Sequence, residues 1–208
     1  MKKCPPKRGR PKDPDKRLAI LESAKELFVE QGYAGTSMDA IAKNAGVSKL
    51  TLYSHFGHKE DLFQQCVVSK CEEHAPHALY DPTNNLPLRK RLLSIGEAFI
   101  ELLFSEEAVK FYRMMAGEAR QTGKLGRLFH AAGPQRMLDQ FEELLAAAVH
   151  NGELEVRDRQ RAANHYFSMM RGDHHMRVIM GEPRPPASEL RAHAADVVEV
   201  FLSAYRPR

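Results

Sequence analysis

Apolar residues recur at steps of three and four along most of this 208-residue chain, which is the period of amphipathic α-helices. One stripe runs from Leu18 to Phe28, and the last runs from Leu190 to Tyr205. Glycines and prolines separate the stripes between them, and no segment alternates as a half-buried strand does. The sequence therefore predicts an all-α fold of about nine helices, with Gly123 and Gly126 following the end of one of them.

The composition is that of a globular protein, with 43% apolar and 28% charged residues. No run approaches the roughly 20 apolar residues that a membrane-spanning helix needs. No apolar segment follows the basic start, so we expect no secretory signal. Three cysteines, an odd number, favour a reducing compartment over a disulfide scaffold. The expected location is the cytoplasm of a bacterium, without a membrane partner.

The net charge of +4 is unevenly distributed along the chain. Residues 1–60 carry +5 and residues 61–208 carry −1, and residues 1–17 alone carry +6. Such an arm suggests a polyanionic partner, either nucleic acid or an anionic membrane surface, although it could also be a solubilising tail. Because the arm lacks the apolar face of a membrane anchor, nucleic acid is the better interpretation.

The segment TSMDAIAKNAGVSKLTLYSHFGHKEDL has the size and turn chemistry of a helix-turn-helix. Two short helices flank a turn that contains Gly46, which tolerates a positive φ. We expect Val47, Leu52 and Phe56 to face inward. The remaining side chains of the second helix suit phosphates and base edges in a DNA major groove: Ser48, Lys49, Thr51, Tyr53 and His55.

These residues resemble the TetR family of bacterial transcriptional regulators. The resemblance runs from Arg17 to Phe63 through ILESAKELFVEQGYAGTSM, IAKNAGVSKLTLYSHF and KEDLF. It implies a three-helix DNA-binding head, a connecting helix and a C-terminal ligand-binding domain that dimerises through its last two helices. The expected domains are a basic arm (1–13), the DNA-binding domain (14–58), and the connecting helix with the C-terminal domain (59–208).

The resemblance also implies roles for single residues. Ser48, Lys49, Thr51 and His55 match positions that touch the major groove, and Tyr53 matches a phosphate-contacting tyrosine. Leu50 departs from the family, because many members have a small residue or proline there. Thr36, with Ser37 beside it, and Lys59 match phosphate contacts at the starts of the second and fourth helices.

The basic arm offers a second DNA contact. Arg8-Gly9-Arg10-Pro11-Lys12 resembles the core of an AT-hook, in which arginines enter a narrow A·T-rich minor groove. We therefore list Arg8, Arg10 and Lys12 as DNA-binding candidates. The alternative is a tail that supplies only non-specific attraction.

The C-terminal half is rich in phenylalanine and methionine, which suits a mostly apolar effector pocket, although each such residue could equally be ordinary core. The candidate pocket residues are Phe99, Phe111, Met114, Met115, Met137, Tyr166 and Met170. The candidate dimer-interface residues are Tyr166, Val197, Val198, Phe201 and Leu202. The long apolar stripe of the last helix supports the prediction of a dimer, since a monomer would expose it.

We predict no metal, no cofactor and no catalytic residues. Cys71, His74 and His77 have ligand-like spacing, but six residues rotate a helix by about 240°, so one face cannot present all three. A metal role for these or for Asp173, His174 and His175, and a redox role for Cys66 and Cys71, are left open. No nucleotide, zinc-protease or hydrolase motif is present in the sequence.

The favoured function is a ligand-responsive regulator, a repressor that binds a pseudo-palindromic operator as a homodimer and is released by a small, largely apolar effector. Its partners would be double-stranded operator DNA, the effector and a second copy. The alternatives are a sequence-tolerant architectural DNA-binding protein without effector, and a small-molecule binding protein with a non-functional head.

Overall fold

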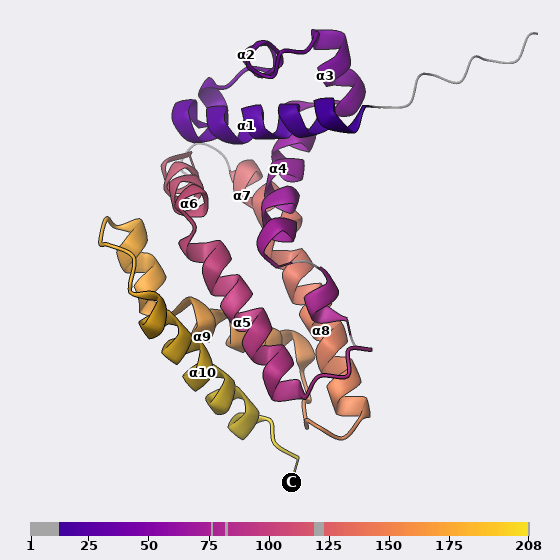
Figure 1. Ribbon diagram of the computed structural model, residues 1–208, viewed down its shortest axis with the longest axis vertical. Helices are drawn as coiled ribbons and strands as arrows, with labels where there is room; N and C mark the ends of the chain where they lie inside the picture. The colour runs from indigo at the N-terminus through magenta and orange to yellow at the C-terminus, as the bar shows by residue number, and fades with distance from the viewer. Residues whose placement is uncertain (1–12, 76, 82, 119–122, 208) are drawn as a thin grey trace, which may run out of the picture. The chain divides into compact units, whose positions relative to one another are not determined.

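The protein is described here from a computed structural model that covers residues 13–75, 77–81, 83–118 and 123–207. Within these ranges every regular element is helical, which confirms the all-α prediction (Figure 1). The chain forms two compact units, which we call the N-terminal unit (Met1–Cys66) and the C-terminal unit (Val67–Arg208). The expected division at residue 58 stays a prediction.

The described helices, in chain order, are α1 (Pro14–Gly35), α2 (Met38–Asn44), α3 (Lys49–His55), α4 (Lys59–His74), the short 3-10 helix η1 (His77–Tyr80), α5 (Leu88–Phe104), α6 (Glu106–Glu118), α7 (Gly123–Ala132), α8 (Pro134–His150), α9 (Arg159–Ile179) and α10 (Ala187–Ala204). The helices expected from the sequence are present, and α7 is additional. Gly123 and Gly126 follow the end of α6, as expected, and both lie within the additional helix α7.

The N-terminal unit begins with α1, whose first turn is fixed by Asp13 and Pro14. The Asp13 carboxylate accepts a hydrogen bond from the backbone N–H of Asp15, and proline at the first helical position lacks only a hydrogen that the helix does not use. Gly32, with a φ of +75°, introduces a kink inside this helix. Leu18 is solvent-exposed, so the inward stripe of α1 begins at Ile20 instead.

The core of the N-terminal unit is formed where α2, α3 and the start of α4 pack on α1. Phe28, Tyr33 and Phe63 pack their rings together with centroids 5.2–5.7 Å apart. The buried hydroxyl of Ser23 donates to the Ile41 carbonyl at 3.2 Å, which joins α1 to α2. Leu52 is also buried. Because α2 packs against both α1 and α3, these contacts fix the position of α3 within the unit.

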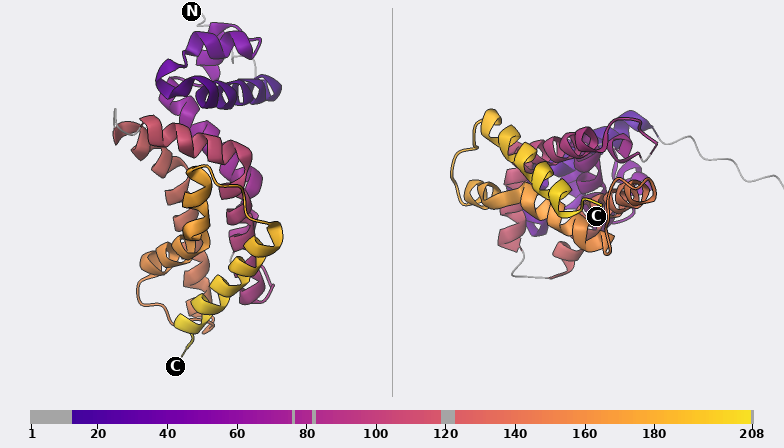
Figure 2. Two further views of the ribbon diagram at one scale, coloured as in Figure 1. Left: turned by 90° about the vertical axis from the view of Figure 1, so that its left-hand side faces the viewer. Right: turned by 90° about the horizontal axis from the view of Figure 1, so that it is seen from below.

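The C-terminal unit is built around a single apolar core to which α5, α8, α9 and α10 contribute. Figures 1 and 2 show α10 beside α5, and α9 packs against both. The Tyr166 hydroxyl donates to the Leu92 carbonyl across the interface between α9 and α5. Gly96 allows this approach, because a Cβ at that position would lie 2.8 Å from the Tyr166 hydroxyl.

The expected dimer-interface residues of α9 and α10 are not on the surface. Tyr166, Val197, Val198 and Phe201 are all buried in the core of the single chain, and Leu202 is half-buried against that core. Contrary to the expectation, a single chain does not expose the last apolar stripe, because α10 buries it on α5 and α9. A dimer contact through α9 and α10 would therefore involve their outward faces.

The expected pocket residues separate into two groups. Phe99, Met137, Tyr166 and Met170 are buried members of the main apolar core. The other three residues, Phe111, Met114 and Met115, lie on α6 outside that core cluster. Only four of the seven expected pocket residues therefore belong to the main apolar core.

No helix within the described residues is both long and apolar enough to span a membrane.

Candidate nucleic-acid interface

The expected helix-turn-helix is formed by α2, a four-residue turn and α3. Gly46 has a φ of +64°, a conformation that L side chains avoid, and its N–H donates to the Lys43 carbonyl. The Val47 N–H donates to the Ala42 carbonyl at 3.0 Å, which closes the turn. Of the residues expected to face inward, Leu52 and Phe56 are buried, whereas Val47 is only half-buried.

Ser48 caps α3. Its Oγ accepts a hydrogen bond from the Thr51 N–H at 3.1 Å and lies 2.9 Å from the Thr51 hydroxyl. This is the capping geometry expected where a serine precedes a short helix. Ser37 caps α2 in the same way, accepting from the Ala40 N–H at 3.1 Å. Both serines are exposed, so each remains a DNA-binding candidate while it fixes the start of its helix.

The exposed face of α3 consists of Lys49, Leu50, Tyr53 and Ser54. These positions are spaced so that they share one side of the helix. Thr51 and His55 are half-buried at its margins. The face combines a cation, hydroxyl groups and one leucine that is 81% exposed, which is a surface suited to phosphates and base edges.

Lys49 is held by an ion pair across the turn. Its ammonium lies 2.6 Å from the carboxylate of Asp39 on α2, and both side chains are largely exposed. Exposed pairs of this kind contribute about 0–1 kcal/mol to stability. Lys49 can therefore exchange Asp39 for a phosphate at little cost.

Thr36 does not occupy the surface position expected of a phosphate contact. It is 1% exposed, and its hydroxyl oxygen lies 2.9 Å from the Leu27 carbonyl and 2.7 Å from the Gly32 carbonyl. The hydroxyl hydrogen is thus used to satisfy carbonyl groups at the end of α1. The Thr36 side chain thus closes this end of α1, and it does not face a phosphate as the resemblance implies.

Lys59 also binds carbonyl groups at this end of α1. Its ammonium donates to the carbonyls of Tyr33 and Thr36, each at 2.7 Å, and lies 4.3 Å from the centre of the Tyr33 ring. A cation is favourable at a helix C-terminus, where carbonyl dipoles converge. In the described state the Lys59 side chain joins α4 to α1, and a phosphate contact would add to or replace these bonds.

Arg8, Arg10 and Lys12 lie outside the described residues.

Two protein-family models match parts of this chain. Residues 20–66 match the family described as "Bacterial regulatory proteins, tetR family", and residues 90–207 match "AefR-like transcriptional repressor, C-terminal domain". The chain belongs to the TetR family. This membership confirms the resemblance found in the sequence and makes the chain a transcription regulator with a DNA-binding helix-turn-helix, rather than an enzyme.

Solved structures match nearly the whole chain. A putative regulator from Mesorhizobium loti is 30% identical with a TM-score of 0.77, covering 92% of this chain and 96% of that one. The flavonoid-responsive regulator FrrA is 31% identical with a TM-score of 0.72, covering 94% and 100%. Among curated relatives, the activator FasR of Mycolicibacterium smegmatis is 37% identical over 50% of this chain. That match spans only 47% of FasR.

The C-terminal unit of this TetR-family chain also contains a row of aromatic rings, in which Phe111 is the one expected pocket residue. His175 on α9 lies 4.9 Å from Tyr112 and 5.8 Å from Phe104, measured between ring centroids, and Tyr112 continues the row to Phe129 and Phe111. Burial, and secondarily the positive charge of Arg171, lowers the pKa of His175 to about 4. Its Nε2 has no hydrogen-bond partner among the described residues. In the sequence His175 stands out only as part of a histidine cluster, because burial is not visible in a single sequence.

In the part of the chain that the structure describes, no group of three or more histidine, cysteine or acidic side chains is placed so that it could hold a metal ion. Cys66 is buried, and burial raises the pKa of its thiol to about 12. Burial likewise raises the pKa of Cys71 to about 11. Both thiols are therefore protonated near neutral pH, and a thiol in that form is a poor nucleophile and metal ligand.

Proposed function

We propose that this TetR-family chain is a repressor that binds a pseudo-palindromic operator as a homodimer and is released by a small, largely apolar effector in the bacterial cytoplasm. The observation that carries the DNA-binding part is the exposed face of α3, which a fixed turn and a capped start present to solvent. The match to a repressor's C-terminal domain supports repression.

DNA binding would place α3 of each protomer in a major groove. In a two-fold complex the two helices would lie about 34–36 Å apart, one helical turn of DNA. Ser48, Lys49, Thr51 and His55 would face base edges and phosphates, with Tyr53 on a phosphate. The experiment is to select duplexes from a random pool with the full chain and to measure their affinity against random DNA. A regulator should prefer the selected sequence by about 10³-fold or more.

Two variants link this preference to α3. Lys49→Ala and Tyr53→Phe should each weaken binding, and loss of the Lys49 phosphate contact should lower the salt slope by about 1. Lys90→Ala on α5 is the matched control, because it removes an exposed lysine from the C-terminal unit. An unchanged affinity for Lys49→Ala and Tyr53→Phe would favour a head that does not bind DNA. Equal affinity for all duplexes would favour an architectural protein.

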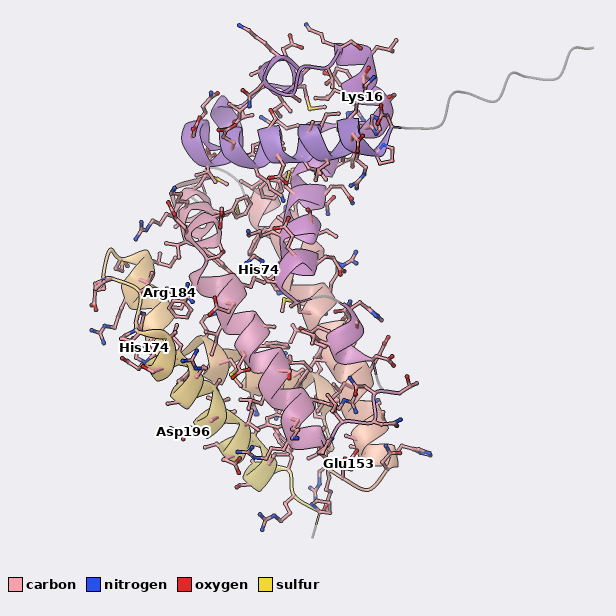
Figure 3. All side chains as sticks on the ribbon, in the orientation of Figure 1. Lys16, His74, Glu153, His174, Arg184 and Asp196 are labelled. Carbon is pink, nitrogen blue, oxygen red and sulfur yellow. The ribbon has the colours of Figure 1, made fainter. Side chains whose placement is uncertain are left out.

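The homodimer would use the outward faces of α9 and α10. Asp196 projects outward from α10 in Figure 3, and Val200, one turn further along, is 55% exposed although apolar. Burial of Val200 against a second copy would remove this exposed surface from water. Val200→Glu should convert a dimer into a monomer in sedimentation experiments. The control Leu86→Glu, at another exposed apolar position, should not. A wild-type monomer at micromolar concentration would refute the dimer.

The effector would bind beside the aromatic row formed by Phe104, Tyr112, Phe129 and His175. A buried imidazole nitrogen without a partner is costly, and a ligand hydroxyl could satisfy it. FrrA responds to flavonoids, as its name states, and is 31% identical over nearly the whole chain. Flavonoids are therefore the first probes. We expect them to release the selected operator, and His175→Phe to weaken that response without weakening DNA binding.

The basic arm would add minor-groove contacts through Arg8, Arg10 and Lys12. Deletion of residues 1–12 should reduce operator affinity, with the largest loss on operators that carry A·T-rich flanks. Equal losses on all flanks would assign the arm to non-specific attraction.

A further inference from the structure

Leu50 is the most exposed large apolar side chain among the described residues, at 81%. It is the second residue of α3, between Lys49 and the Thr51 N–H that Ser48 caps. It lies on the same exposed face as Lys49 and Tyr53. An exposed leucine contributes nothing to the core of the N-terminal unit, so the side chain is free to meet a partner of α3.

We propose that Leu50 reads the C5-methyl group of a thymine in each half-site of the operator. The inference rests on the proposed function, because it requires α3 to enter the major groove. The first residues of the second helix in a helix-turn-helix are the ones that reach base edges. Among the four bases only thymine presents an apolar group in that groove. A leucine placed against the polar edge of another base would instead block that edge's hydrogen bonds with water.

The neighbouring contacts support this assignment. Lys49 can be drawn to a phosphate by exchanging its exposed Asp39 partner, and Tyr53 is exposed one turn from Lys49 on the same side. Two groups suited to the DNA backbone thus lie around a side chain that cannot form a hydrogen bond. The backbone contacts would set the register of the helix, and Leu50 would add sequence preference.

The test uses the operator selected with the full chain. Each thymine is replaced in turn by uracil, which lacks only the methyl group, and affinity is measured for the wild type, Leu50→Ala and Leu50→Met. Removing one buried methyl-sized group should weaken wild-type binding about fourfold at one thymine per half-site. Leu50→Ala should lose this sensitivity at that thymine alone, and Leu50→Met should retain most of it. Circular dichroism checks folding, which an exposed side chain should not affect.

The inference is overturned if wild type and Leu50→Ala respond identically to every uracil, or if no thymine is sensitive. That is also the result expected if Leu50 instead packs against another protein. Failure to select any duplex would refute the proposed function along with it. Selection that succeeds, with Lys49→Ala weakening binding but no uracil effect, would refute only the role of Leu50.

Discussion

His175 should make the protein less stable as the pH falls through the range just below neutrality. Its imidazole is buried against Tyr112 and Phe104, and burial, with the nearby charge of Arg171, lowers its pKa to about 4 from an ordinary 6.5. The folded state therefore resists protonation that the unfolded chain accepts. The contribution of His175 is fully present above about pH 6.5, declines as the pH falls, and decreases no further below about pH 4.

The size of the effect follows from these two pKa values. For a pKa of about 4 in the folded state and 6.5 in the unfolded state, linkage predicts a free energy of unfolding roughly 2 kcal/mol lower at pH 5 than at pH 7. Partial solvation of the charged form reduces this to about 1–2 kcal/mol. Urea denaturation of the full chain, followed by circular dichroism at both pH values, measures the difference.

His175→Phe isolates this contribution from those of the other titratable groups. Phenylalanine keeps a ring against Tyr112 but cannot be protonated, so the loss of stability between pH 7 and pH 5 should shrink by about 1–2 kcal/mol. Any repacking cost changes the stability at both pH values equally. His130→Gln, which removes an exposed histidine from α7, should leave the pH dependence close to that of the wild type. Identical pH dependence in wild type and His175→Phe would refute the reasoning.

Three further substitutions test the packing described above by urea denaturation. Gly96→Ala should cost about 1–3 kcal/mol, because the new methyl group would collide with Met170 and approach the Tyr166 hydroxyl to 2.8 Å; a neutral effect would mean that α5 and α9 are not so close. Gly46→Ala should cost about 1–2 kcal/mol from backbone strain alone, since no atom lies within 4 Å of the added Cβ; no loss would argue against the positive φ. Lys59→Met should cost about 1–3 kcal/mol by removing two charge-assisted hydrogen bonds to the end of α1, and an unchanged stability would show that they contribute nothing net.

The helix-turn-helix could be predicted from sequence because local chemistry determines it. Gly46 is needed by the turn, Ser48 by the helix start, and the inward positions of Leu52 and Phe56 follow from helical periodicity. Each requirement involves neighbours within a few residues. The resemblance to the TetR family covers the same segment, so local chemistry and family resemblance lead to the same prediction.

The C-terminal unit was harder to predict because its important contacts join distant residues. An apolar stripe on α10 looks the same whether it packs on α5 of its own chain or on a second copy, and here it packs on its own chain. Likewise Gly123 and Gly126 are poor helix formers, yet both lie within α7. The environment of His175 requires α5, α6 and α9 to be placed together, which no local pattern specifies.

The polar residues of the N-terminal unit reveal a more general limit, since the groups that bind phosphates also suit helix ends. A lysine ammonium that fits a phosphate also fits the carbonyls at the end of α1, as Lys59 does, and a threonine hydroxyl can close the same end, as Thr36 does. Such residues differ in the interactions that each would lose on binding a phosphate. Lys49 would exchange one exposed carboxylate, at a cost of about 0–1 kcal/mol. Thr36 would leave buried carbonyls unsatisfied, at a cost of about 1–3 kcal/mol. We therefore expect DNA to contact Lys49 and not the Thr36 side chain. Thr36→Val should reduce stability more than it reduces operator affinity. Lys49→Ala should reduce operator affinity more than it reduces stability.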